Sequence, residues 1–255
     1  SCDDGELAAL GRLHNVSQGI SAFRDGRRAG FSNISLDLMY GLPNQTKDSW
    51  RRSLGQALAL EPEHLSLYQL SIEENTVFQD RFQQGCLILP DEDEILAMDE
   101  ITLELCTKNK FTQYEISNFS RPGFGCRHNV VYWQNDEYLA CGAGAVSYLD
   151  GRRARRISDP VRYCEQLLQN KPVVEESEQL DEAASFRETV IMGLRLLAGV
   201  EENRLIKRYG LSYRDVYGDT LVKLVAGGLL ELRGPVLALS VKGRRFANVV
   251  MTELV

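Results

Sequence analysis

Hydrophobic and polar positions alternate with two different periods over residues 1–120. Segments in which apolar residues recur at helical spacing cover residues 5–14, 19–31, 46–60 and 91–109. Short apolar runs typical of strands cover residues 33–40, 64–72 and 113–119. Repeated steps of about 30 residues from helix to strand predict βα units, a parallel sheet and an α/β fold class. In such sheets, ligands bind at the carboxyl ends of the strands.

The segment that follows the last of these strands is long, polar and aromatic. It reads SRPGFGCRHNVVYWQNDEY over residues 120–138, and we interpret it as a loop at a strand end. The loop places Cys126, His128 and Tyr132 within seven positions, and all three side chain types can bind a metal. Because long loops with such side chains are more often functional than simple connections, this segment is a candidate site.

Residues beyond 150 have a different pattern. A helix and an acidic connection lead into mainly helical sequence, then into two apolar strands around a turn at residues 233–235 and a last helix. This order is typical of a winged-helix-like module, and its weakly basic surface favours packing or partner contact over DNA reading. The predicted divisions are a barrel part over 1–150, a linker with a connecting helix over 151–180, and a mainly α domain over 181–255.

Charge and hydropathy exclude several classes of function. The net charge is −7, from 29 basic and 36 acidic side chains, which disfavours binding to nucleic acid. The basic run GRRARR over residues 151–156 is interpreted as a solvated turn, with a local phosphate or carboxylate contact as the alternative. No apolar run approaches the roughly 20 residues of a membrane-spanning helix, so we expect a cytoplasmic protein without stable membrane insertion.

The cysteines do not form a recognisable metal motif. There are six, with no CxxC pair and no triplet that could hold zinc or an iron–sulfur cluster from one loop. We therefore expect most of them to be small, reduced core residues. They are Cys2, Cys86, Cys106, Cys126, Cys141 and Cys164.

Asp37 is the most unusual residue of the first predicted strand, because it interrupts the apolar run SLDLMYG. A buried carboxylate is costly unless it is paired or holds a ligand. Asp37 is therefore a candidate contact for sugar hydroxyls or for a cation, and the alternative is an aspartate that faces an edge or forms a salt bridge.

Several motifs together resemble the HemN/HemW branch of the radical S-adenosylmethionine (SAM) enzymes. They are LGRLH, SLDLMYGLPNQT, HLSLYQLSIEENT, QYEISNFSRPGFGCRHNVVYW and YLACGAGA, in the order of the family and over essentially the whole chain. Within the branch, HNVVY over residues 128–132 is similar to the HNxxY pattern of haem chaperones, whereas the oxygen-independent coproporphyrinogen III oxidases carry another sequence at this point.

The resemblance implies a fold, cofactors and site residues. The fold would be part of a radical SAM barrel with parallel strands, followed by the winged-helix-like C-terminal domain. The family's SAM-binding residues fall on Arg12 and Asp37, where a guanidinium suits the methionine carboxylate and a carboxylate suits hydroxyl or amino donors. His128 and Tyr132 are implied haem-binding residues, with His128 as an iron ligand and Cys126 as a further candidate. The alternative is that His128 caps a carbonyl and Tyr132 packs into the core.

The family's CxxxCxxC motif for a 4Fe-4S cluster is expected before the first residue of this chain. We therefore expect a fragment that is not catalytically competent alone, with the cluster present only in the full-length protein. A barrel that lacks strands exposes a sheet edge, which favours a homodimer.

The function implied by the resemblance is that of a haem chaperone, which binds haem and transfers it to an acceptor protein. One alternative is an oxygen-independent coproporphyrinogen III oxidase, which decarboxylates its substrate by radical SAM chemistry in porphyrin biosynthesis. A second alternative is a non-catalytic interaction domain.

Overall fold

The computed structural model describes all residues, 1–255, and its packing divides the chain into two compact units, Ser1–Gly125 and Cys126–Val255. The predicted domain boundaries at residues 150 and 180 describe domains of the family, not compact units, and they stay predictions. None of the helices is both long and apolar enough to cross a membrane.

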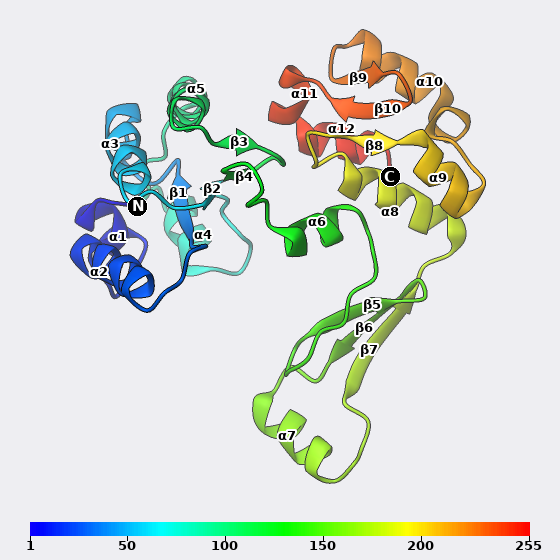
Figure 1. Cartoon of the computed structure of the whole chain (residues 1–255), viewed down its shortest axis with the longest axis horizontal. Coiled ribbons are helices and arrows are strands. Elements are labelled where there is room, and N and C mark those ends of the chain that lie inside the picture. Colours follow the sequence, from blue (N-terminus) through cyan, green and yellow to red (C-terminus); the bar gives the residue numbers. More distant parts are fainter. The chain divides into compact units, whose positions relative to one another are not determined.

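The first unit is a four-stranded sheet with helices packed against it (Figure 1). Its helices are α1 (Asp4–Ala9), α2 (Val16–Arg28), α3 (Lys47–Leu58), α4 (Val77–Gln83) and α5 (Glu92–Lys108). Its strands are β1 (Ser35–Tyr40), β2 (His64–Gln69), β3 (Thr112–Gln113) and β4 (Asn118–Ser120). In the order β1-β2-β4-β3, β1 and β2 are parallel, but β4 is antiparallel to both of its neighbours. The parallel-sheet prediction is therefore confirmed for one pair only.

Residues alternate between two faces of β1 and β2, and one face makes the core. Leu38, Tyr40, Leu65 and Leu67 are buried in one hydrophobic cluster with residues of α3 and α5. Trp50 is fully buried in this cluster, and its indole N–H donates to Thr102 Oγ1 at 2.9 Å. The opposite face of the strands carries the polar side chains, as the period of two along a strand requires.

Two helix boundaries in the first unit differ from the sequence prediction. The helix predicted over residues 5–14 ends at Ala9, because Gly11 takes a left-handed φ of 68° that turns the chain. The next helix begins at Val16, three residues earlier than predicted, because Asn15 and Gln18 form a capping box. The predicted N-cap of α3 is confirmed, since Thr46 accepts from the Ser49 N–H.

The second unit contains two three-stranded sheets and the remaining helices. The first sheet, β5-β6-β7, consists of β5 (Val146–Leu149), β6 (Arg152–Arg156) and β7 (Val174–Gln179). The second, β8-β10-β9, consists of β8 (Val200–Glu201), β9 (Leu230–Arg233) and β10 (Val236–Leu239). The helices are α6 (Arg127–Trp133), α7 (Pro160–Leu168), α8 (Glu182–Gly193), α9 (Glu202–Tyr209), α10 (Tyr213–Ala226), α11 (Val241–Arg245) and α12 (Ala247–Glu253).

The basic run predicted as a solvated turn is instead a strand. Only Gly151 belongs to the turn, and residues 152–156 form β6, which is antiparallel to the acidic β7. Arg155 faces Glu176 across the pair, with 2.6 Å between Nη2 and Oε1. The carboxylate alternative is thus confirmed, because the two oppositely charged segments, far apart in sequence, pair as neighbouring strands.

Charge reversal at Glu176 tests this pairing. Glu176→Lys places two cations opposite each other, and we expect the free energy of unfolding to fall by about 0.5 kcal/mol, since both side chains are solvated. Urea unfolding in low and high salt measures the effect, which should shrink as salt screens the charges. The double variant with Arg155→Glu should recover the loss, and a double variant no more stable than Glu176→Lys would contradict the pairing.

Candidate functional site

The first unit has a cavity of about 510 Å³ beside β1. Arg12 and Asp37, the two residues that the family resemblance assigns to SAM, both line it, together with His14. The apolar part of the lining comes from Leu7, Leu10, Val16, Ile20, Leu36, Leu38, Met39, Leu60 and Tyr68, among others. The structure therefore brings the predicted pair together in a cavity of the size usual for a small-molecule ligand.

The end of α1 places Arg12 at the cavity. Gly11 has a left-handed φ of 68°, and the Arg12 N–H donates to the Leu7 carbonyl at 2.9 Å, which closes the helix. Glu6 anchors the same helix, because its buried carboxylate accepts from Gln45 Nε2 at 2.9 Å and from the Ser49 hydroxyl. Arg12 is exposed, so its guanidinium is accessible to an anionic group of a ligand.

Asp37 is exposed, so its interpretation as a buried carboxylate was wrong. Leu38 and Tyr40 point toward the helices and are buried, whereas Asp37 lies on the other face of β1 and opens into the cavity. Within this chain, β1 is also the edge strand of its sheet. The carboxylate is exposed and forms no salt bridge, which suits a contact to ligand hydroxyls or amines.

The haem candidates lie on a helix and not in the predicted loop. Cys126 is the N-cap residue of α6, and its side chain makes no capping hydrogen bond. His128 and Tyr132 are four positions apart, so the helix places them on one face, and their ring centroids are 4.7 Å apart in an edge-to-face arrangement. The imidazole of His128 is exposed and makes no hydrogen bond, so the alternative in which it caps a carbonyl is wrong.

A series of aromatic rings continues from α6 into the sheet. Tyr132 contacts Tyr138 with ring centroids 4.5 Å apart, and Tyr138 is followed by Tyr148 of β5 at 6.2 Å. Burial raises the pKa of Tyr138, so its phenol stays neutral at physiological pH. Tyr132 is half-buried by this packing, which leaves His128 as the exposed end of the series.

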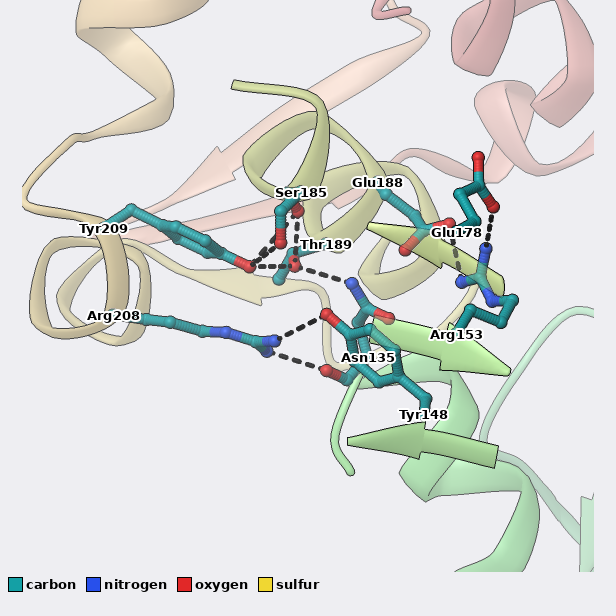
Figure 2. A network of polar contacts seen from close by, with 9 residues as sticks. All are labelled: Asn135, Tyr148, Arg153, Glu178, Ser185, Glu188, Thr189, Arg208 and Tyr209. Atoms are coloured by element: carbon teal, nitrogen blue, oxygen red, sulfur yellow. Dashed lines mark hydrogen bonds and ion pairs between the residues drawn. The ribbon is translucent and has the colours of Figure 1, made fainter. Parts of the chain in front are cut away.

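Three residues directly after α6 are held by α8 and α9. Arg208 of α9 donates to the Asn135 carbonyl at 2.7 Å and to the Tyr148 hydroxyl at 3.3 Å (Figure 2). Arg204 donates to the Gln134 carbonyl at 3.1 Å and pairs with Asp136. Cations at the carboxyl end of a helix also stabilise its dipole, so the two arginines fix the end of α6.

Asn135 is the centre of this contact, which we call the Asn135 clamp: Asn135 with Thr189, Arg208 and Tyr209. Asn135 is buried with a left-handed φ of 50°, and its amide donates to Thr189 Oγ1 of α8 at 3.0 Å. Tyr209 Oη lies 2.7 Å from the same Thr189 oxygen. Figure 2 marks this hydrogen bond with a dashed line. The sequence pattern did not indicate these residues. The only signal was Asn135 itself, because asparagine is common in turns and tolerates the left-handed conformation.

A second, half-buried contact connects the sheet to α8. Arg153 of β6 donates to Glu188 Oε1 of α8 at 2.9 Å and lies 3.6 Å from Glu178 Oε2 of β7 (Figure 2). Its guanidinium also lies over the Tyr148 ring, 5.7 Å from the centroid. The sheet that carries Tyr148 is thereby attached to the same helix that holds Asn135.

The side chains of this chain do not fit an iron–sulfur cluster. No group of three or more His, Cys, Asp or Glu residues lies close enough together to hold a metal ion. None of the six cysteines forms a disulfide, and only Cys106 is buried, so the prediction that most of them are core residues was wrong.

The comparisons with known proteins identify the family. The model of the HemN C-terminal domain matches residues 180–246, a span that begins just before α8 and ends just after α11. The chain is 34% identical over 248 residues to the Heme chaperone HemW of Bacillus subtilis (strain 168), which covers 97% of this chain and 65% of that protein. The chain belongs to the HemN/HemW family.

Further members support the assignment. The Heme chaperone HemW of Escherichia coli (strain K12) is 32% identical over 97% of this chain and 64% of its own length. The radical S-adenosyl methionine domain-containing protein 1, mitochondrial, of Mus musculus is 34% identical over 91% of this chain and 55% of its own length. This member of the family thus spans less than two thirds of each of these relatives.

A solved structure shares the fold. The coproporphyrinogen III oxidase HemN of Escherichia coli, a radical SAM enzyme, superposes with a TM-score of 0.78. The match covers 98% of this chain and 61% of that one, at 19% identity. At this identity the likeness shows the mixed α/β fold with parallel strands, and it does not favour the oxidase activity for this family member.

Proposed function

We propose that this protein is a haem chaperone, which binds haem at α6 and transfers it to an acceptor protein. The observation that carries the proposal is the exposed imidazole of His128, which makes no hydrogen bond and is braced by the Tyr132 ring. Neutral imidazole is a common axial ligand of haem iron. The relatives named Heme chaperone HemW support the same function.

The positions of His128 and Tyr132 on one helix separate their roles. Two axial ligands of one haem lie on opposite sides of the porphyrin, whereas residues four apart on a helix lie side by side on the same face. We therefore assign iron ligation to His128 and assign to Tyr132 the orientation of the imidazole through ring contact. Cys126 stays a candidate contact at the beginning of the helix.

The cavity at Arg12 and Asp37 supports SAM as a second ligand. A guanidinium would bind the carboxylate of the methionine part, and Asp37 would bind hydroxyl or amino groups. When bound, SAM would supply the radical chemistry of the family, for which the iron–sulfur cluster of a full-length protein is required. The expected cytoplasmic location stays a prediction.

We also infer that residues 181–255 form a winged-helix-like module whose role is to pack against the haem-binding segment. The order helix, strand, two helices and hairpin supports this assignment. Arg204 and Arg208 of α9 contact residues 134–136 within the unit, which supports a packing role over contact with nucleic acid.

Haem titration tests the proposed function. We expect the unaltered chain to develop a Soret band with saturable affinity, and His128→Ala to bind at least about tenfold more weakly with a shifted band. Tyr132→Phe keeps the ring and should bind almost normally, whereas Tyr132→Ala should weaken binding. His14→Ala, which removes another exposed histidine, is the matched control. Equal affinities and spectra for the chain and His128→Ala would exclude His128 as the ligand.

A further inference from the structure

His64 is a buried histidine whose two ring nitrogens both have partners. It begins β2, and its Nδ1 lies 2.9 Å from Ser35 Oγ while its Nε2 lies 2.9 Å from the Tyr114 hydroxyl. Ser35 faces His64 across the parallel pair of β1 and β2, and Tyr114 lies in the connection between β3 and β4. The imidazole therefore connects the hairpin of β3 and β4 to β1.

The connection continues from Ser35 to the cavity. Ser35 and Asp37 are two positions apart on β1, so both side chains lie on the same face of the strand. The Ser35 hydroxyl donates to Asp37 Oδ1 over 3.4 Å. This is the longest hydrogen bond in the series Tyr114–His64–Ser35–Asp37. The other oxygen, Oδ2, makes no hydrogen bond within the chain, and Asp37 lines the cavity.

The direction of each hydrogen bond follows from the number of protons. An ionised carboxylate only accepts, so the single hydroxyl proton of Ser35 goes to Asp37 and Ser35 must accept from His64. Nδ1 therefore carries the proton, and Nε2 accepts from the Tyr114 hydroxyl. Burial lowers the pKa of His64 despite the opposing effect of Asp37, so the imidazole is neutral at pH 7.

We propose that His64 is a positioning residue for the ligand site at Asp37. Its imidazole, held by Tyr114, fixes the Ser35 hydroxyl so that this hydroxyl donates to one oxygen of Asp37. The second oxygen is left for a hydroxyl or ammonium group of the ligand. This role goes beyond that of a histidine whose hydrogen bonds only stabilise the core. It rests on the proposed use of the Arg12 and Asp37 cavity as a ligand site.

The tautomer of His64 tests the hydrogen-bond series without any ligand. Long-range proton–nitrogen correlation spectra of the histidine-labelled chain distinguish the two neutral tautomers, and with three histidines the assignment is simple. We expect Nδ1 of His64 to carry the proton at pH 7. A proton on Nε2 would overturn the series, because Ser35 would then have to donate to His64 and not to Asp37.

Ligand affinity tests the positioning role, with S-adenosylhomocysteine as the probe in calorimetric titrations of the 255-residue chain. Ser35→Ala, at an exposed strand position, should weaken binding about fivefold, the effect of roughly one hydrogen bond. His64→Gln places its amide near the position of Nε2, so the contact to Ser35 is lost and binding should weaken equally. The double variant Ser35→Ala with His64→Gln should bind no more weakly than either single variant. His64→Asn places its amide near Nδ1 and should largely retain affinity.

Controls separate this inference from the proposed function. Ser32→Ala removes an exposed serine outside β1 and should leave both affinity and melting temperature unchanged. If the unaltered chain does not bind the probe, the proposed ligand site fails and the positioning role fails with it. If the chain binds but Ser35→Ala and His64→Gln bind equally well, only the positioning role of His64 is overturned.

Discussion

Replacement of Asn135 by alanine is expected to lower the free energy of unfolding of the second unit by about 2–4 kcal/mol. The variant removes the buried hydrogen bond to Thr189. It also places alanine, which tolerates the left-handed conformation less well than asparagine, at a φ of 50°. It leaves in place the Arg208 contact to the backbone carbonyl of residue 135. Because the clamp fixes the end of α6, we also expect weaker haem binding at His128.

Asn135→Gly separates the two parts of this effect. Glycine accepts the left-handed conformation, so only the loss of the side-chain hydrogen bond remains, and we expect a cost of about 1–2 kcal/mol. Urea unfolding gives the stabilities, and the fluorescence of Trp133, two residues before Asn135, reports on the end of α6 after Trp50→Phe removes the other tryptophan. A stability of Asn135→Ala equal to that of the unaltered chain would contradict the clamp.

The matched control is Tyr217→Phe in the same compact unit. The Tyr217 hydroxyl is buried without a hydrogen-bond partner, so its removal should leave stability unchanged or raise it slightly. Haem affinity should fall in the Asn135 variants and stay unchanged in Tyr217→Phe. Equal losses of haem affinity in Tyr217→Phe and Asn135→Ala would show that the clamp has no particular connection to α6.

Gly243→Ala is expected to have an effect of similar size in the C-terminal module, about 3 kcal/mol of lost stability. A Cβ at this position would lie 1.8 Å from the Leu229 carbonyl oxygen, and backbone cannot move aside as a flexible side chain can. Ser240 connects the same two segments, because its N–H donates to Leu229 O at 3.1 Å and its hydroxyl donates to Gly228 O at 2.6 Å. In Gly243→Ala, α11 therefore has to separate from the turn between α10 and β9.

Gly55→Ala provides the comparison, because both glycines lie in helices. A Cβ at Gly55 would meet nothing within 4 Å, so alanine should raise stability by about 0.5–1 kcal/mol through its better helix propensity. Chemical unfolding of both variants by circular dichroism measures the difference. If Gly243→Ala is as stable as the unaltered chain, the close approach of α11 to Leu229 is not real.

The local pattern predicted α3, α5 and the first two strands because their signals are local. Thr46 and the acidic first turn of α5 lie where the helices begin, and the apolar residues repeat with the period of each element. The prediction was wrong for β6 and α6. A run of arginines resembles a turn until an acidic strand pairs with it, and the seven residues of α6 are too few to show a helical period.

The candidate site was predictable in part. Arg12 and Asp37 followed from the family resemblance, and the structure places them in one cavity. The residues that orient the site were not predictable, because Asn135, Thr189 and His64 act through partners about 30 to 70 positions away in the chain. A hydrogen bond between such positions leaves no period or spacing in the sequence.

The sequence by itself determined the helices with caps, the parallel βα step, the identity of the family and the chemical types of the candidate ligands. Each of these depends on neighbouring residues or on a motif read along the chain. Only the tertiary structure decided that Asp37 is exposed, that His128 and Tyr132 share one helix face, and that Arg153 and Arg155 pair with carboxylates. Exposure and pairing depend on which distant segments pack together, and the burial of apolar surface selects that packing for the chain as a whole.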